Sequence, residues 1–318
     1  PAIDAQFKFQ SELGPDHRGR VVVFVQSKEG QTLDSQDLES QIVQNAELVL
    51  TNGTIGPINV FVQTRAVQPL ISSDAINKLG VVQRLGQGES YFYDSIPERV
   101  YNIGLGAEKI NGSLVSPGET FSFNQAIGTV SAVFGFRKAY AIIQGKTVLD
   151  DGGGVCQVST TLYRAVLNSG LPVVERTAHS YRVGFYEEGG FLPGLDATVY
   201  PPSPDFKFKN DTANSILIQA TFDKAKSKLT FELFGTSDGR VSTVSKPIIL
   251  STSPPPEPVY EDDATLPAGQ VKQVDTAHAG AKVYFTRMVT RNGETLINER
   301  VDSDYVPWPA RYLRGTKT

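Results

Sequence analysis

The chain has 318 residues, of which 40% are hydrophobic and 20% charged, a balance typical of folded proteins. This composition excludes a wholly disordered chain, a collagen-like repeat and a coiled coil. The 30 basic and 34 acidic residues leave a net charge of −4, so nothing favours nucleic-acid binding. No apolar run approaches the roughly 18 residues of a membrane span, so no membrane contact is expected from this chain. It begins at Pro1 with no basic or apolar leader, so we expect a trimmed fragment from which any targeting segment has been removed.

Sulfur and imidazole groups are scarce in this chain. Cys156 is the only cysteine, so no internal disulfide can form and hydrophobic cores must hold the fold. The three histidines are His17, His179 and His278. With one cysteine they are too few for a structural zinc site. Five residues in the central part of the chain have side chains that could together bind a metal ion, but their spacing matches no known metal motif. They are Asp150, Asp151, Cys156, His179 and Asp196. We therefore expect neither a metal ion nor a cofactor.

Residues 1–75 are predicted to form a small α+β module. Apolar residues alternate over 5–9, and a solid apolar run follows over 21–25. Asp34 or Ser35 can cap the helix that comes next. The predicted elements are strands over 5–9 and 21–25, a helix over 35–48 and a strand over 58–67. None of these elements has a catalytic appearance.

Residues 76–244 are predicted to form a domain in which a helix packs on a mostly antiparallel sheet. A first helix is expected over 98–112, where Gly112 is placed to end it. A second helix is expected to begin at Cys156 and to end before Gly170. The expected strands are 121–124, 172–176, 180–185, 197–200, 216–222 and 228–234.

The C-terminal part is predicted to be a linker followed by a small all-β module. Residues 245–258 are rich in proline among serine and threonine, which is typical of an extended linker. Residues 259–318 contain two strand patterns, 283–290 and 295–301, on either side of Asn292-Gly293, a strong hairpin signal. Together with the preceding segments, this predicts an α+β fold class.

The segment most informative for chemistry is the triple glycine that precedes Cys156. Glycines at 152–154 allow backbone conformations closed to other residues and let a substrate approach the main chain. Cys156 then falls at a helix N-terminus, where unpaired N–H groups and the helix dipole stabilise a thiolate. The backbone over 152–157 could also hold the oxyanion of an acyl-transfer reaction.

A nucleophilic thiol needs a base and usually an orienting group, and two candidates follow Cys156. His179 comes 23 residues later, and Asp196 comes 17 residues after His179. This order, with the cysteine at a helix start, resembles that of the transglutaminase and papain-like thiol enzymes. Structural alternatives stay open at each position: a small buried hydrophobe at Cys156, a structural histidine at His179 and a turn cap at Asp196.

Motifs over about residues 85–235 resemble the VanW family, which is named after a protein of B-type vancomycin resistance clusters. The residues that carry the resemblance are Arg99-Val-Tyr-Asn102, Ser116–Asn124, Ile127-Gly128, Gly152–Tyr163, Glu175-Arg176, His179-Ser180 and Leu195-Asp-Ala-Thr198. The resemblance implies a bacterial, exported or membrane-anchored protein of the cell envelope. It implies no reaction, because the activity of the family is not established.

The substrate-binding candidates lie within these motifs. They are Gly153, Gly154, Gln157, Ser159, Arg176 and Ser180. Gln157 and Ser159 fall in the first turn of the helix that begins at Cys156. Because serine is also an ordinary residue at a helix start, a purely structural role stays open for Ser159.

Both flanking modules also resemble envelope proteins. Gly30, Leu33 and Asp34 resemble a peptidoglycan-binding module that often precedes VanW domains. Residues 266–315 are similar to five-glycine surface domains that bind N-acetylglucosamine polymers, and depart from them in ending with Tyr305-Val-Pro-Trp308. The expected partner is therefore peptidoglycan or another cell-wall glycan or peptide, and the expected location is extracellular or in the envelope.

Three functional hypotheses follow. The first is a thiol hydrolase or acyltransferase of peptidoglycan peptide stems, with Cys156 as nucleophile, His179 as base and Asp196 as orienting acid. The second is a non-catalytic peptidoglycan-binding scaffold whose tandem modules gain avidity for a polymer. The third is a redox thiol, against which the lack of a second cysteine argues. The variant Cys156→Ser separates the first from the second, since only an enzyme loses activity.

Overall fold

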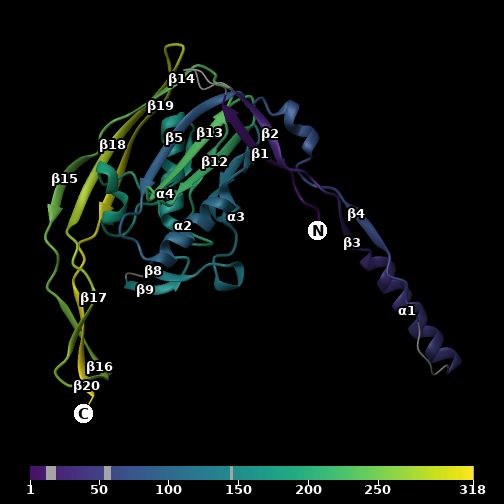
Figure 1. Cartoon of the computed structure of the whole chain (residues 1–318), viewed down its shortest axis with the longest axis horizontal. Helices are drawn as coiled ribbons and strands as arrows, with labels where there is room; N and C mark the ends of the chain where they lie inside the picture. Colours follow the sequence, from purple (N-terminus) through teal and green to yellow (C-terminus); the bar gives the residue numbers. More distant parts are fainter. Residues whose placement is uncertain (12–18, 54–58, 144–145, 318) are drawn as a thin grey trace. The chain divides into compact units, whose positions relative to one another are not determined.

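The computed structural model describes the chain except for residues 12–18, 54–58, 144–145 and 318. The chain divides into two compact units. One unit comprises Pro1–Gln10 with Val21–Lys78, and the other comprises Ser11–Arg20 with Leu79–Thr318. Helices and strands are numbered in chain order in Figure 1.

The N-terminal elements have the α+β character that the sequence predicts. Helix α1 begins where the Asp34 side chain accepts a hydrogen bond from the Asp37 N–H at 3.2 Å, and it ends at Gly53, whose φ is 61°. The strand expected over 58–67 is shorter, because only 64–67 pair with β3; residue 58 lies outside the described residues. The elements are β1 (Gln6–Ser11), β2 (Gly19–Val25), β3 (Gly30–Leu33), α1 (Ser35–Asn52), β4 (Thr64–Val67) and the 3₁₀ helix η1 (Ser73–Lys78).

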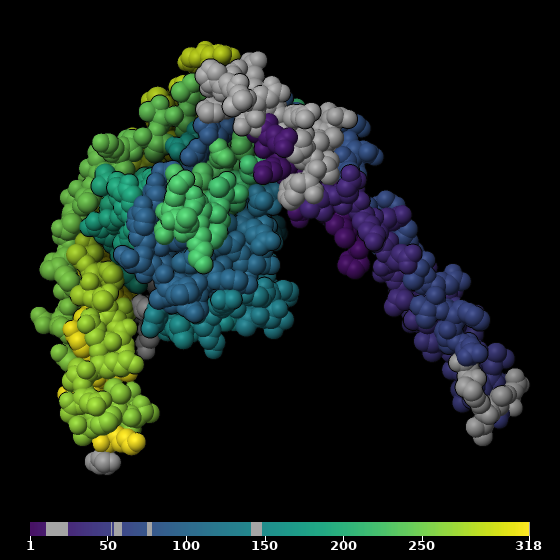
Figure 2. Space-filling view, viewed as in Figure 1, coloured from purple at the N-terminus to yellow at the C-terminus, as the bar shows by residue number. Residues whose placement is uncertain are grey.

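Helix α4 (Val155–Ser169) is the centre of the second unit. It packs on an antiparallel sheet with strand order β5–β13–β12–β6 (Figure 1). Gly88 on β5 permits close approach, because a Cβ there would lie 2.3 Å from the backbone nitrogen of Ala165. Figure 2 shows the blue β5 segment beside the green β13 segment. The elements of this layer are β5 (Gln83–Tyr91), α2 (Pro97–Ile110), β6 (Leu114–Val115), β12 (Ile216–Asp223) and β13 (Lys228–Gly235).

Shorter elements make up the rest of the central domain. They are β7 (Thr120–Ser122), α3 (Phe123–Ile127), η2 (Ala132–Phe134), β8 (Lys138–Ile143), β9 (Lys146–Asp151), β10 (Val173–Glu175), η3 (Gly184–Tyr186), η4 (Glu188–Gly190) and β11 (Lys207–Lys209). Strands β10, β11 and β7 form a three-stranded sheet, and β8 pairs with β9 in a hairpin that leads into the glycine loop.

Two strands expected near the candidate site are absent from the described residues. The segment 180–185 is a loop that runs into η3, and 197–200 makes a single bridge, from Thr198 to Thr177. The apolar alternation of Tyr181 and Phe185 reflects separate packing partners, the Trp308 ring for the first and the Arg99 guanidinium for the second. Irregular backbone therefore carries both His179 and Asp196.

The C-terminal region is all-β, as predicted, and consists of two sheets. The first contains β14 (Arg240–Val244), β15 (Ile248–Ser253), β18 (Gly280–Arg291) and β19 (Glu294–Tyr305). The second contains β16 (Val259–Pro267), β17 (Val271–Asp275) and β20 (Arg311–Lys317). The hairpin turn between β18 and β19 is where the sequence predicts it, with positive φ at Asn292 and Gly293.

The linker expected over 245–258 contains regular structure. Strand β15 lies within it and pairs antiparallel with β18, so the expectation of an irregular segment is wrong over 248–253. Pro247 and Pro254 stand just outside this exposed edge strand, so neither has to donate a ladder hydrogen bond. The strand therefore forms an edge of the first C-terminal sheet.

Strand β18 is anchored in the same core as α4. Phe285 is fully buried among the apolar side chains of that core. The buried Arg287 guanidinium donates to the Leu171 carbonyl oxygen at 2.6 Å, and Arg240 donates to that of Gly170 at 2.9 Å. The first C-terminal sheet therefore belongs to the hydrophobic core of the second unit.

Candidate active site

The glycine loop and the start of α4 place the thiol. Gly154 is the N-cap residue of α4, and Cys156 is the second residue of the helix. Gly152 and Gly154 have φ values of 84° and 109°, which side chains rarely tolerate. Gly153 is closely packed, since a Cβ there would lie 2.6 Å from the Tyr140 carbonyl oxygen. The triple glycine thus lets the chain turn tightly into the helix, as the sequence predicts.

Cys156 is half-buried and lies against the His179 side chain. The His179 imidazole is close enough to the thiol for each group to shift the pKa of the other. The sulfur also lies 3.4 Å from the Val199 carbonyl oxygen and 3.7 Å from the Thr198 hydroxyl. The thiol is therefore electrostatically coupled to the predicted base, and it retains some exposed surface.

His179 is held by Asp196 through two hydrogen bonds. One carboxylate oxygen of Asp196 lies 2.6 Å from the ring Nδ1 of His179 and accepts from the backbone N–H of the same residue at 2.9 Å. Both side chains are buried, with exposed fractions of 4% and 3%. The Tyr186 ring packs against the imidazole at a centroid distance of 4.6 Å. The structure thus joins the three residues selected from the sequence in the order Cys156, His179, Asp196.

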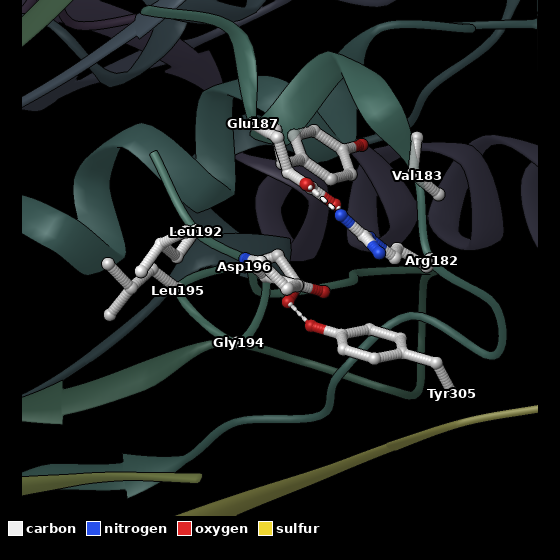
Figure 3. Close-up of a pocket in the computed structure, with 10 residues that line it drawn as sticks. Arg182, Val183, Glu187, Leu192, Gly194, Leu195, Asp196 and Tyr305 are labelled. Atoms are coloured by element: carbon white, nitrogen blue, oxygen red, sulfur yellow. Dashed lines mark hydrogen bonds and ion pairs between the residues drawn. The ribbon is translucent and has the colours of Figure 1, made fainter. Parts of the chain in front are cut away.

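The second carboxylate oxygen of Asp196 has two further partners. It accepts a hydrogen bond from the Tyr305 hydroxyl, at the end of β19, and pairs with Arg176 at 3.3 Å (Figure 3). The Arg176 guanidinium also donates to the backbone oxygens of Asp196 and Gly194 at 2.7 and 2.9 Å, and to the Ser303 hydroxyl at 3.0 Å. Both carboxylate oxygens are therefore hydrogen-bonded.

The surrounding groups favour a charged Cys156–His179 pair. Burial disfavours the thiolate, but the hydrogen bond and charge of His179 outweigh it and lower the pKa of Cys156. Burial likewise disfavours the imidazolium, but Asp196 and Cys156 outweigh it and raise the pKa of His179 to about 9. Against its own burial, the pKa of Asp196 is held below its usual range by His179, Arg176 and Tyr305.

Four of the predicted substrate-binding residues have structural contacts of their own. Gln157 is fully buried, accepts from Arg99 at 2.6 Å and donates to the Ser90 hydroxyl at 3.1 Å. Ser159 is fully buried and donates to the Ala197 carbonyl oxygen at 2.6 Å. Arg176 supports Asp196, and Gly153 is enclosed by β8. Direct contact with a substrate is therefore not expected for Gln157 or Ser159, because neither has exposed surface.

The other two candidates remain accessible. Ser180 is exposed, and its carbonyl oxygen accepts from the Val306 N–H at 2.8 Å. Gly154 is partly exposed beside Arg99, which lies over the Phe185 ring at 4.1 Å. Both positions retain exposed surface, two residues before Cys156 and one residue after His179 in the sequence.

Sequence reasoning missed three residues of this site. Tyr305 is separated from Asp196 by 109 positions in the chain, and Tyr186 contacts His179 from η3. Arg99 had a local signal, since it opens the first family motif of the central domain. Nothing local in the sequence marks Tyr305, because its role depends on how β19 packs.

Behind Asp196 lies a small cavity, drawn in Figure 3. Its volume is about 10 Å³, which is close to the space of one water molecule. Arg182 and Glu187 form an ion pair of 2.6 Å at its edge, and Asp196 and Tyr305 line it on the other side. The carboxylate is thus enclosed and has little access to bulk solvent.

Neither a metal-binding cluster nor a membrane-spanning helix occurs in the part of the chain that the structure describes. Within the described ranges, no cluster of three or more histidine, cysteine, aspartate or glutamate side chains could hold a metal ion. Over those same ranges, no helix has the length and apolar character needed to cross a membrane.

Comparisons with known proteins place two domains on the chain. Residues 98–234 match the family described as VanW like protein, and residues 243–317 match the G5 domain. The protein YoaR of Bacillus subtilis (strain 168) is 39% identical over 165 residues, 52% of this chain and 52% of that protein. The vancomycin B-type resistance protein VanW of Enterococcus faecalis (strain ATCC 700802 / V583) is 31% identical over 128 residues, 40% of this chain and 46% of that protein. The chain thus spans about half the length of the curated relatives it matches.

Two solved structures resemble part of the chain. The G5 domain of an IgA1 protease is 24% identical and covers 25% of this chain and 92% of its own, with a TM-score of 0.17. The HP0197 G5 structure is 18% identical and covers 24% of this chain and 97% of its own, with a TM-score of 0.14. By the family matches, the chain carries a VanW-like domain over 98–234, followed by a C-terminal G5 domain over 243–317.

Proposed function

We propose that this protein is a cell-wall thiol enzyme that cleaves or transfers amide bonds in the peptide stems of peptidoglycan. The observation that carries the proposal is the connected set of Cys156, His179 and Asp196 at the start of α4. A buried carboxylate that orients a histidine toward a helix-terminal thiol is the arrangement that nucleophilic thiol catalysis needs. The VanW-like and G5 domains support association with the cell wall and, with it, export.

The reaction would begin with attack by the Cys156 thiolate on a substrate carbonyl carbon. A C–S bond forms, the amide C–N bond breaks, and the imidazolium of His179 gives its proton to the leaving amine. In the second half-reaction a water molecule or an acceptor amine attacks the thioester carbonyl and gives a proton to His179. The C–S bond then breaks, and the thiolate–imidazolium pair is restored.

One backbone amide in the first turn of α4 can stabilise the oxyanion. The N–H groups of Val155 and Gln157 already donate to the carbonyl oxygens of Gly152 and Gly154, both at 3.0 Å. We assign the role to the Cys156 N–H, the remaining amide of this turn, which also lies at the positive end of the helix dipole. The wider oxyanion site expected over 152–157 is thereby reduced to one backbone donor and the helix terminus.

The test uses the full chain and purified peptidoglycan. Wild-type protein is incubated with sacculi and with soluble muropeptides, and new amines and masses are followed by mass spectrometry. Cys156→Ala should abolish product formation, while Ser251→Ala, on the exposed strand β15, should give the wild-type products. Product formation that persists in Cys156→Ala would contradict the proposal.

A non-catalytic scaffold is the second candidate function, and the G5 match favours it. G5 domains are known to bind cell-wall glycans, so the C-terminal strands would retain the protein on the sacculus. In this case Cys156→Ala binds sacculi like the wild type, and neither protein releases muropeptides. Co-sedimentation with sacculi, combined with the turnover assay, separates the two functions.

A further inference from the structure

The G5 domain reaches the Asp196 carboxylate. Tyr305, the last residue of β19, donates its hydroxyl hydrogen bond to the oxygen of Asp196 that does not contact His179. Ser303, two residues earlier on the same face of β19, accepts from Arg176 at 3.0 Å. Both are buried, with exposed fractions of 3% and 4%. Two side chains of one strand therefore support the same carboxylate, one directly and one through Arg176.

The end of β19 is held in this position from both sides. The Val306 N–H donates to the carbonyl oxygen of Ser180, the residue after His179, at 2.8 Å. On the neighbouring strand, Phe285 is fully buried in the core that surrounds α4, and Arg287 bonds to Leu171. The contact between Tyr305 and Asp196 therefore rests on a packed strand pair.

We infer that Tyr305 is a positioning residue of the thiol centre, supplied by the G5 domain, and that the VanW-like domain alone lacks a complete site. This inference rests on the proposed thiol chemistry. The oxygen of Asp196 that faces His179 makes two bonds to it, so rotation of the carboxylate would break both. Tyr305 and Arg176 hold the other oxygen and oppose that rotation.

The hydroxyl of Tyr305 also has an electrostatic effect. A hydrogen bond donated to an ionised carboxylate favours the ionised form, and here it adds to His179 and Arg176 in keeping the pKa of Asp196 low. An ionised Asp196 in turn raises the pKa of His179, which stabilises the thiolate. Loss of the hydroxyl should therefore weaken the thiolate–imidazolium pair of Cys156 and His179. Tyr305 acts on this pair through Asp196, which contacts His179.

The experiment measures the rate of iodoacetamide alkylation of the full chain between pH 5 and 10. Cys156 is the only cysteine, so the rate reports a single thiol. Tyr305→Phe keeps the ring and removes the hydroxyl, so it should raise the pKa of the Cys156 thiol. A rise of about 0.5 to 1 lowers the alkylation rate about three- to tenfold at any pH below the thiol pKa of both proteins, and it leaves the rate at high pH unchanged. Tyr312→Phe is the matched control, because Tyr312 belongs to the same domain and stacks on Tyr260 in the other sheet. Its profile should superimpose on that of the wild type.

The outcomes separate this inference from the proposed function. In one outcome the pKa of the wild-type thiol lies below its usual value and rises in His179→Ala, but does not change in Tyr305→Phe. That outcome overturns the inference and leaves the proposed thiol centre intact. A wild-type thiol that reacts only after unfolding overturns both. If Tyr305→Phe does not fold, Ser303→Ala replaces it: removal of the Arg176 acceptor should shift the profile in the same direction, and an unchanged profile would refute the inference.

Discussion

The backbone N–H and the ring Nδ1 of His179 both bond to the same oxygen of Asp196, at 2.9 and 2.6 Å. A single carboxylate oxygen thus fixes both the position of the histidine backbone and the orientation of its ring. With Nδ1 committed to Asp196, Nε2 is the ring nitrogen left to contact the Cys156 thiol. The loop that carries His179 has no regular secondary structure. The two bonds to Asp196 therefore fix the position of His179, which no ladder of strand hydrogen bonds holds.

The variant Asp196→Asn should strongly reduce the reactivity of Cys156. An amide carries no charge to stabilise the imidazolium, so the pKa of His179 falls and the thiolate loses its partner. The pKa of the Cys156 thiol should rise as a result, and a rise of about one lowers the alkylation rate about tenfold at any pH below the thiol pKa of both proteins. Asp302→Asn, which removes an exposed carboxylate from β19, serves as the control and should react like the wild type. A reactive thiol in Asp196→Asn would mean that His179 needs no carboxylate.

The same carboxylate should make stability depend on pH in the acid range. The pKa of Asp196 in the folded protein lies below its usual value of 3.8, so its contribution to stability is present above pH 3.8. That contribution is lost as the pH falls from 3.8 through the pKa of Asp196 in the folded protein. Over this range the unfolded chain already binds the proton at Asp196 and the folded protein does not. Above pH 5 we expect Asp196→Asn to be less stable by about 3 kcal/mol, the scale for breaking a buried ion pair.

Urea unfolding at a series of pH values measures this effect. The difference in free energy of unfolding between the wild type and Asp196→Asn should narrow steadily below pH 3.8. A difference that stays constant down to pH 2 would show that Asp196 has the same pKa in the folded and unfolded states.

Gly153→Ala should disturb the start of α4. A Cβ at this position would lie 2.6 Å from the Tyr140 carbonyl oxygen and 2.7 Å from the Ala139 carbonyl carbon, so the loop would have to move. Gly184→Ala is the matched control, because a Cβ there has open space around it. We expect slower alkylation of Cys156 and a lower unfolding midpoint in Gly153→Ala alone. Equal behaviour of the two variants would show that the loop tolerates a side chain.

Phe285→Ala should destabilise the central domain as well as the G5 domain. Phe285 is fully buried in the core around α4, so its removal should cost about 3–5 kcal/mol. Met288→Ala, on the same strand but 47% exposed, should cost less than about 1 kcal/mol. Circular dichroism and alkylation of Cys156 during urea unfolding should report one common transition. Two separate transitions would refute the shared core.

The residues of the thiol centre could be predicted where the signal is local. Three glycines before Cys156 indicate a tight turn into a helix, and Gly170 indicates its end. Asn292-Gly293 indicates the hairpin equally clearly, because both positions adopt the positive φ that asparagine and glycine tolerate. In each case the conformational demand of one or two residues determines the local structure.

The rest of the site depends on contacts between distant parts of the chain. Tyr305 lies in a segment that resembles a separate module, and only the packing of β18 and β19 brings it to Asp196. Gln157 was predicted to face a ligand, yet Arg99 and Ser90 surround it. A sequence pattern identifies the side of a helix but not which neighbours cover it.

The pH profile of Cys156 alkylation in the wild type and in His179→Ala tests the central claim most directly. The account predicts a wild-type thiol whose pKa lies below its usual value of 9.0, so that the alkylation rate reaches its plateau at a lower pH than that of an ordinary thiol. His179→Ala should lose this shift, because burial then acts on the thiol without a compensating charge. A wild-type thiol that titrates at or above 9.0, with a profile unchanged in His179→Ala, would contradict the account.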